Sequence, residues 1–287
     1  MIKHDITRVK RRRYQISRGR EFGRRTNERI KQRLKKPIPR MVVPSFFTLM
    51  NLFCGFLAIL QVYEGYLVYG AWLIVLAALF DALDGFMARL TNGQSEFGLE
   101  LDSISDVVSF GAAPGFLIYA WIFSGHGALI LLFVAALPVL CGAVRLARFN
   151  VEAKIEDHSY FRGLPIPAQA MMLVAFFLTF HHRMEIFDVF NNGVMTPLVT
   201  IVILLSLLMV STVPFDKVPR FNKSYIQQHK VRVFLFIFYA LAIIAFQEYG
   251  LIVVFTIFIF RGIWNSAKRF WQDVMSDDEK IVTTDNY

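Results

Sequence analysis

Eight apolar segments separated by short polar stretches constrain this chain more than any other feature of its sequence. They lie at about residues 45–63, 66–90, 100–124, 127–149, 165–182, 195–213, 231–247 and 249–265. A helix needs roughly 20 apolar residues to cross the hydrocarbon core of a bilayer. Charged residues make up only 18% of the chain, against about 25% in an average soluble domain. The pattern predicts an all-α polytopic membrane protein with about eight transmembrane helices, and it excludes an ordinary soluble enzyme.

The last two apolar segments are shorter than the others. They are separated only by the sequence Gln247-Glu248-Tyr249-Gly250. Two readings follow: a tight helical hairpin, which we favour, or one re-entrant element that does not cross the membrane twice. In either case residues 216–287 form a C-terminal unit with an acidic tail, separate from a helical core at 44–215.

The first 40 residues form a basic arm. They hold 16 Lys and Arg residues against three acidic residues, and they contain no apolar run. A nucleic-acid-binding arm is one reading of such a segment. We favour attraction to anionic lipid instead, worth roughly 1 kcal/mol per basic residue near the surface, because the arm runs directly into a membrane span. Residues 1–43 are therefore predicted to be a cytoplasmic juxtamembrane arm that binds no nucleic acid.

The distribution of basic residues predicts the orientation of the chain. If the N-terminus is cytoplasmic, the inner regions are the loops near 90–100, 146–164 and 214–231 and the C-terminal tail. Of the 15 Lys and Arg residues after position 40, 14 fall in these regions and only Arg183 falls outside. Cytoplasmic loops are enriched in Lys and Arg. The sequence thus predicts an integral protein of the cytoplasmic (inner) membrane with both termini in the cytoplasm.

Two pairs of aspartates stand out within the apolar body. Asp81 and Asp84 are three residues apart at the cytoplasmic end of the second segment, and Asp102 and Asp106 are four apart at the start of the third. Residues three or four apart share one helix face. The short connection 90–99 makes the two helices antiparallel neighbours. Both pairs are therefore expected to face each other at one depth.

Four carboxylates in this position require a partner. An aspartate deep in a membrane helix costs on the order of 3 kcal/mol, and crowded carboxylates repel one another. A divalent cation removes both problems, and carboxylate oxygens without Cys or His favour Mg²⁺ or Mn²⁺. Four aspartates suffice for one or two ions, and two ions would clamp a phosphate. The predicted metal ligands are Asp81, Asp84, Asp102 and Asp106.

Small residues and one cation accompany the aspartates. Gly85 and Ala88 keep the helix surface beside Asp84 shallow, and Gly98 opens the next helix without a bulky side chain. Arg89 supplies a guanidinium group, which suits a phosphate. The segment is therefore expected to bind a phosphate-bearing ligand against a flat wall.

This segment resembles the signature of the CDP-alcohol phosphatidyltransferases, D-x2-D-G-x2-A-R-x8-G-x3-D-x3-D. Every fixed position is present, as Asp81, Asp84, Gly85, Ala88, Arg89, Gly98, Asp102 and Asp106. The resemblance implies a helical membrane enzyme with a six-helix core at 44–215, usually a homodimer. It also implies a metal-dependent transfer of a phosphatidyl-type group from a CDP-linked donor to an alcohol, with release of CMP.

The family's roles carry over onto the matching positions. The resemblance implies that Asp81, Asp84 and Asp102 ligate metal. It implies that Asp106 is the general base and also touches a second ion. The CDP-diacylglycerol site would be lined by Gly85, Ala88, Arg89 and Gly98.

Three further stretches resemble the phosphatidylserine synthase branch of that family. They are residues 44–55 in the first span, Arg145-Leu-Ala-Arg148-Phe-Asn150 at the end of the fourth, and Gly163-Leu-Pro-Ile-Pro-Ala168 before the fifth. The expected acceptor is then L-serine, whose carboxylate requires a cation. Arg145 and Arg148, with Asn150, are the predicted serine-binding residues. The alternative is that these arginines are ordinary anchors that extend to the membrane interface.

Thr48 and Asn51 share one face of the first span. We predict that they contact the CDP moiety, although Thr and Asn also serve as plain interhelical hydrogen-bond formers. The expected reaction is attack of the serine hydroxyl, deprotonated by Asp106, on CDP-diacylglycerol. Glycerol 3-phosphate, inositol phosphate and choline remain alternative acceptors. An ion-coupled carrier is a remote alternative, because membrane aspartates also bind transported ions.

Overall fold

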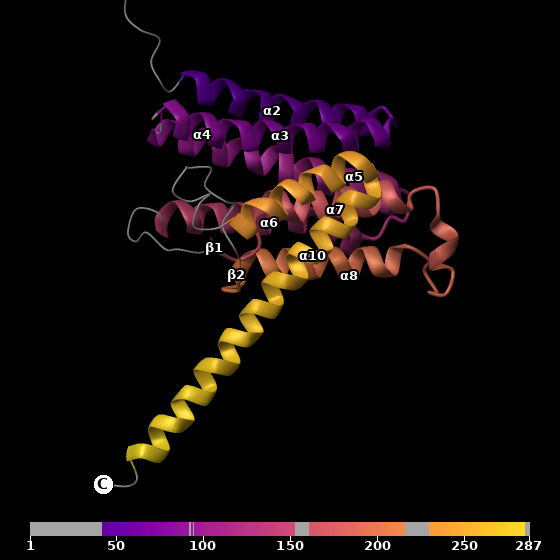
Figure 1. Cartoon of the computed structure of the whole chain (residues 1–287). Coiled ribbons are helices and arrows are strands. Elements are labelled where there is room, and N and C mark those ends of the chain that lie inside the picture. Colours follow the sequence, from indigo (N-terminus) through magenta and orange to yellow (C-terminus); the bar gives the residue numbers. More distant parts are fainter. Residues whose placement is uncertain (1–41, 92, 94, 153–160, 216–229, 285–287) are drawn as a thin grey trace, which may run out of the picture.

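The computed structural model describes residues 42–91, 93, 95–152, 161–215 and 230–284. The helices in these ranges are α2 (Val42–Tyr63), α3 (Leu67–Thr91), α4 (Glu96–Asp106), α5 (Ala113–Ile118), α6 (Leu129–Glu152), α7 (Ile166–Phe180), α8 (Met195–Val210) and α10 (Lys230–Thr284). They form a helical bundle, with α2 and α3 on one side and α8 on the other (Figure 1). Nearly all of the predicted basic arm lies outside the described residues.

The third apolar segment forms one long helix that changes its winding twice. Two π-helical turns flank α5. The first, η1 (Val107–Ala112), joins α4 to α5, and the second, η2 (Tyr119–Phe123), follows α5. A π-turn inserts an extra residue into the helix and is frequent at functional sites. Here the first such turn begins directly after Asp106. It therefore changes the direction of the side chains that follow the second aspartate pair.

Five helical stretches of the described residues are long and apolar enough to cross a membrane. They are Val42–Tyr63, Leu67–Thr91, Glu96–Phe123, Leu129–Glu152 and Ala245–Lys268. The apolar helices α7 and α8 are shorter, with 15 and 16 residues. The prediction of an all-α polytopic membrane protein is thus confirmed. That all eight apolar segments cross the membrane stays a prediction.

Helix α7 is the centre of the bundle. Twelve of its 15 residues are buried, and it packs against α3, η1, α8 and α10. Neighbouring helices therefore surround most of its length. An almost uniformly apolar helix is expected in such a position.

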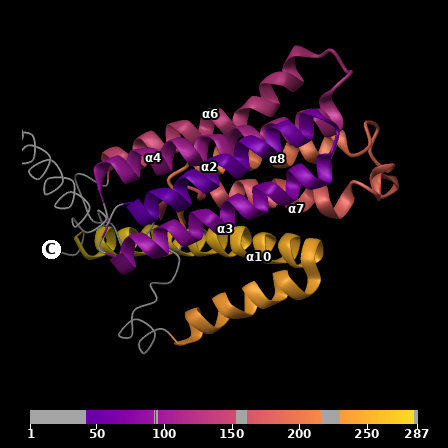
Figure 2. The ribbon, with the colours of Figure 1, turned by 90° about the horizontal axis from the view of Figure 1, so that it is seen from above.

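The C-terminal unit is a helical hairpin. At Gln247 the backbone has φ 47° and ψ −115°, which breaks the helix into two limbs. The limbs lie side by side (Figure 2), and a Cβ on Gly250 would overlap the backbone of Ala242. Thr179 on α7 donates a hydrogen bond to the Glu248 carbonyl at 3.4 Å. The predicted tight hairpin is confirmed, while its crossing of the membrane twice stays a prediction.

A short two-stranded ladder closes one end of α8. Strand β1 (Phe161–Arg162) pairs antiparallel with β2 (Pro214–Phe215). The chain then turns at Gly163, which has φ +81°, and a Cβ there would overlap the Met209 carbonyl oxygen. Only glycine adopts this conformation in this space. The sequence pattern predicts no strand here, because two residues carry no alternation that could be recognised.

We expect Gly163→Ala to destabilise the protein more than Gly65→Ala. Both glycines have positive φ, but a Cβ on Gly65 would meet nothing within 4 Å. A left-handed alanine costs roughly 1–2 kcal/mol, and overpacking at Gly163 adds about 1–3 kcal/mol. Thermal unfolding in detergent measures both variants. Equal losses at the two positions would show that the contact with α8 contributes nothing.

Candidate metal centre

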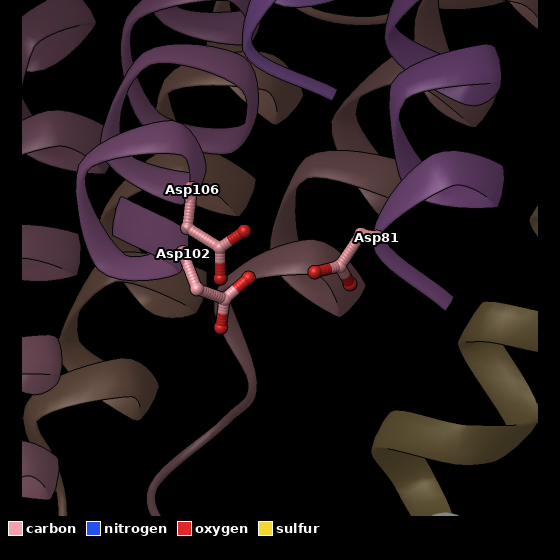
Figure 3. A group of neighbouring side chains, drawn as sticks. All are labelled: Asp81, Asp102 and Asp106. Carbon is pink, nitrogen blue, oxygen red and sulfur yellow. The ribbon is translucent and has the colours of Figure 1, made fainter. Parts of the chain in front are cut away.

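Three carboxylates meet between α3 and α4, two helices that both pack against α2. One oxygen each of Asp81, Asp102 and Asp106 lies within 4.8 Å of the other two. Asp81 approaches from α3, and Asp102 and Asp106 approach from successive turns of α4 (Figure 3). The antiparallel pairing of the two helices and the spacing of the aspartates produce this arrangement, as the sequence predicts.

Asp84 does not belong to this close group. Its side chain is buried, with 6% of its surface exposed, and its charge interacts with those of Asp81 and Asp102. It also faces the hydroxyl group of Thr48. The structure therefore brings three of the four predicted ligands together and places the fourth beside them. A role for Asp84 as a direct ligand stays a prediction.

The oxygen atoms of this cluster fit a cation. Among the described residues, the buried Oδ2 of Asp84 and Oδ1 of Asp102 have no hydrogen-bond partner. Buried carboxylate oxygens without partners are costly, and like charges at this separation repel. A divalent ion held by the clustered carboxylates would offset their repulsion and compensate the burial of Asp102. Hard oxygen donors without nitrogen or sulfur are suited to Mg²⁺ or Mn²⁺.

Asp106 is held between two other helices. The Nδ2 group of Asn51 on α2 donates a hydrogen bond to Oδ1 of Asp106 at 3.4 Å. Arg145 on α6 attracts the Asp106 carboxylate electrostatically. All three side chains are buried, with exposed fractions of 6% or less. The predicted base is thus the most enclosed member of the cluster.

Two serines fasten α2 to the helix that carries Asp102 and Asp106. Ser105 donates to the carbonyl of Thr48 at 3.1 Å, and Ser109 donates to the carbonyl of Asn51 at 3.0 Å. A Cβ on Gly55 would overlap Ser109, so the two helices are in close contact. Neither serine was among the residues predicted from the sequence. Their spacing, three residues after each aspartate of the pair, was the available signal.

The start of α4 is fixed by a local cap. Ser95 is the N-cap residue, and its side chain accepts a hydrogen bond from the Gly98 amide at 3.0 Å. This interaction satisfies one of the free amides at a helix start. Just after the end of α3, the amide of Gly93 donates a hydrogen bond to the carbonyl of Ala88 at 3.0 Å. Both ends of the connection are therefore defined within a few residues of the aspartates.

The surface near Gly85 is open, as expected for a ligand wall. A Cβ on Gly85 would have only the guanidinium nitrogens of Arg89 within 4 Å, at 3.9 Å. Arg89 is itself exposed at the end of α3. Gly98 has only the Ser95 hydroxyl nearby. Contact of these residues, and of Ala88, with a nucleotide stays a prediction.

Arg148 is engaged elsewhere in the fold. Its guanidinium group donates to four backbone carbonyls at 2.8–3.4 Å, those of Val210, Arg162, Met209 and Ser211. It joins α6 to the C-terminal end of α8 and to β1. This is a structural role that the sequence analysis did not foresee. The serine-binding role of Arg148 stays a prediction and would require a change in these bonds.

Asn150 connects α6 to α4 beside the cluster. Its Nδ2 group donates to Oγ of Ser103 at 3.0 Å and approaches Glu100 at 3.5 Å. Its buried Oδ1 has no hydrogen-bond partner among the described residues. An amide oxygen in this state is available to accept a hydrogen bond from a ligand. Of the three predicted serine-binding residues, Arg145 interacts with Asp106, and Asn150 contacts α4 at Ser103.

The comparisons with known proteins cover the part of the chain that contains this site. The family model described as CDP-alcohol phosphatidyltransferase matches residues 41–213. This range contains the three clustered aspartates, Asn51 and Arg145. It also contains all eight positions of the signature read from the sequence.

Named relatives extend the similarity beyond the signature. A CDP-diacylglycerol–serine O-phosphatidyltransferase of Helicobacter pylori is 36% identical over 187 residues, covering 64% of this chain and 75% of that protein. The corresponding enzyme of Methanocaldococcus jannaschii is 39% identical over 186 residues, covering 65% and 78%. The crystal structure of Mycobacterium tuberculosis phosphatidylinositol phosphate synthase with CDP-DAG bound is 22% identical. It covers 63% of this chain and 85% of that chain, with a TM-score of 0.42.

Proposed function

The chain belongs to the CDP-alcohol phosphatidyltransferase family, and from that premise we propose that it is a CDP-diacylglycerol–serine O-phosphatidyltransferase. It transfers the phosphatidyl group of CDP-diacylglycerol to the hydroxyl group of L-serine and releases phosphatidylserine and CMP. The observation that carries this proposal is the cluster of Asp81, Asp102 and Asp106 within 4.8 Å. The relatives named as serine enzymes, 36–39% identical over about two thirds of the chain, support the choice of acceptor.

The chain's own residues supply the proton transfer and the positioning. Asp106 accepts the proton of the serine hydroxyl. The serine oxygen then forms a bond to the phosphorus that bears diacylglycerol, and the bond from that phosphorus to the CMP oxygen breaks. Catalysis in such a step depends mainly on positioning and on charge neutralisation. Asn51 and Arg145, which approach Asp106 from α2 and α6, hold the base in place.

A Mg²⁺ or Mn²⁺ ion held by Asp81, Asp102 and Asp84 would neutralise negative charge on the pyrophosphate. Arg89, beside the open surface at Gly85, would bind the phosphates from the cytoplasmic side. Gly85, Ala88 and Gly98 leave space for the nucleotide. The acyl chains would remain among the apolar helices of the bundle.

The acceptor pocket lies between α4 and α6 in this proposal. Arg145 would bind the serine carboxylate, and the unpartnered Oδ1 of Asn150 would accept a hydrogen bond from the serine ammonium group. Arg148, bound to four carbonyls, would shape the pocket from behind. The assignment predicts that acceptors without the carboxylate group or without the ammonium group of serine are poor substrates.

We expect CMP release by the purified protein to depend on L-serine. CDP-diacylglycerol and Mg²⁺ or Mn²⁺ are supplied, and CMP is measured with serine, glycerol 3-phosphate, inositol phosphate, choline or no acceptor. Release with serine alone supports the proposal. Release only with a phosphorylated acceptor would keep the family chemistry and refute the serine pocket. No release with any acceptor, from folded protein, would favour an ion carrier instead.

The remaining proposals concern the chain in its membrane. We propose that both termini are cytoplasmic, because this orientation places 14 of the 15 Lys and Arg residues after position 40 in cytoplasmic loops or the C-terminal tail, as the enrichment of such loops in basic residues requires. The cytoplasmic (inner) membrane then provides CDP-diacylglycerol from the same side as serine. The basic arm would bind anionic lipid, and the enzyme would act as a homodimer, as its family resemblance implies.

A further inference from the structure

We infer that Asn51 is a positioning residue for the proton-accepting carboxylate Asp106, rather than a contact for the nucleotide. This inference rests on the proposed function, in which Asp106 is the base. The sequence favours a nucleotide contact for Asn51, because Thr48 and Asn51 share one helix face. The structure instead turns the Asn51 amide toward Asp106, 55 positions away in the chain.

The hydrogen bond orients the carboxylate of Asp106. Nδ2 of Asn51 donates to Oδ1 of Asp106, while Asp106 also belongs to the carboxylate cluster with Asp81 and Asp102. A carboxylate can rotate about its last bond with little restriction. A donor fixed on one oxygen restricts that rotation. The second oxygen is then available to the cluster and to the hydroxyl group of the acceptor.

The position of Asn51 is itself rigid. Its backbone carbonyl accepts the hydrogen bond of Ser109, and one turn earlier the Thr48 carbonyl accepts that of Ser105. Four residues later, Gly55 allows α2 to contact Ser109 closely. Three contacts over two turns therefore fix α2 against the helix that carries Asp106. The Asn51 amide moves with that helix and not independently of it.

The burial of Asn51 favours a role in positioning Asp106 over direct contact with the nucleotide. None of the surface of Asn51 is exposed, whereas Asn150 as a whole is only partly buried. The Oδ1 of Asn51 also has no hydrogen-bond partner among the described residues, but the full burial of the side chain keeps that oxygen out of a ligand's reach. A residue that binds a nucleotide directly needs a surface that the ligand can reach. Asp106 retains 6% exposure, belongs to the carboxylate cluster and accepts the hydrogen bond of Asn51. Asn51 thus acts on substrate only through Asp106.

The test uses Asn51→Leu, which keeps a similar size and removes the donor. General acid–base catalysis contributes about 10²–10⁴-fold, and we expect loss of the orienting bond to lower kcat by about 30-fold or more. The KM values for CDP-diacylglycerol and serine should change by less than about threefold. Asn51→Ala repeats the measurement if the leucine variant does not fold. CMP binding in the presence of Mn²⁺ verifies that the nucleotide site is intact.

Thr179→Val is the matched structural control. Thr179 is also a buried polar residue that joins two helices, through its hydrogen bond to Glu248, but it lies at the far end of α7. It should lower the unfolding temperature and leave kcat unchanged. If Asn51→Leu instead raises the KM for CDP-diacylglycerol at normal kcat, Asn51 is a nucleotide contact and the inference is wrong. Wild-type kcat and KM in that variant would refute it equally, whereas an inactive wild-type protein would refute the proposed function itself.

Discussion

Replacing Asp106 by Asn is expected to abolish turnover while leaving the protein folded. Asparagine has the shape of aspartate, and its oxygen can still accept the hydrogen bond from Asn51 that the structure shows. It cannot accept the proton of a serine hydroxyl. General-base catalysis contributes about 10²–10⁴-fold, so the rate of serine-dependent CMP release should fall by at least about 100-fold. The rate is measured with saturating CDP-diacylglycerol and serine.

A matched variant on the same helix controls for changes in charge. Glu96 lies in the first turn of α4 and is exposed, away from the three clustered carboxylates. Glu96→Gln removes one carboxylate from that helix and should retain the wild-type rate. The unfolding temperature and CMP binding of Asp106→Asn should also stay close to wild type. Wild-type turnover in Asp106→Asn would exclude this residue as the base.

Removal of divalent metal is expected to abolish activity and to lower stability together. Asp81 and Asp102 approach each other from α3 and α4, so without a cation their repulsion acts between the two helices. Ligand that binds only the folded state stabilises it by about 2.7 kcal/mol at a concentration 100 times its dissociation constant. Addition of Mn²⁺ to chelator-treated protein should therefore raise the unfolding temperature measurably and restore CMP release.

Variants of the ligands should separate metal binding from the rest of the fold. In Asp102→Asn, one charge is lost and the repulsion decreases, so the metal-free protein should be at least as stable as wild type. Addition of Mn²⁺ should no longer raise its unfolding temperature, and turnover should be lost. The Glu96→Gln protein again serves as the control, with a full response to Mn²⁺. An undiminished Mn²⁺ shift in Asp102→Asn would remove Asp102 from the metal site.

The carboxylate cluster was predictable because its information is local. Helical periodicity places Asp102 and Asp106 on one face, and a short connection makes α3 and α4 antiparallel. These two facts suffice to bring Asp81 to the same point, as the structure confirms. Asp84 follows the same rule less well. A position three residues along a helix is rotated by about 60° from the ideal face, and the neighbouring helices decide whether such a side chain reaches the centre.

The partners of Asn51 and Arg148 were not predictable in the same way. Asn51 bonds to a residue 55 positions away, and Arg148 bonds to carbonyls that lie 14 to 63 positions away. Every residue has a backbone carbonyl, so no pattern in the sequence marks the four that accept from Arg148. The rotation of each helix about its axis, set by close contacts such as that of Gly55 with Ser109, determines which partners meet.

By itself, the sequence determined that this chain is a helical membrane protein with a carboxylate site where two consecutive helices are joined. Composition and periodicity carry that information, because the bilayer requires apolar helices and because a helix repeats every 3.6 residues. Only the tertiary structure decided that α7 is the buried centre and that Asp106 interacts with Asn51 on α2 and Arg145 on α6. These features depend on packing between segments far apart in the chain. Apolar side chains of similar size occur in all of these segments, so no pattern in the sequence identifies which segments pack together.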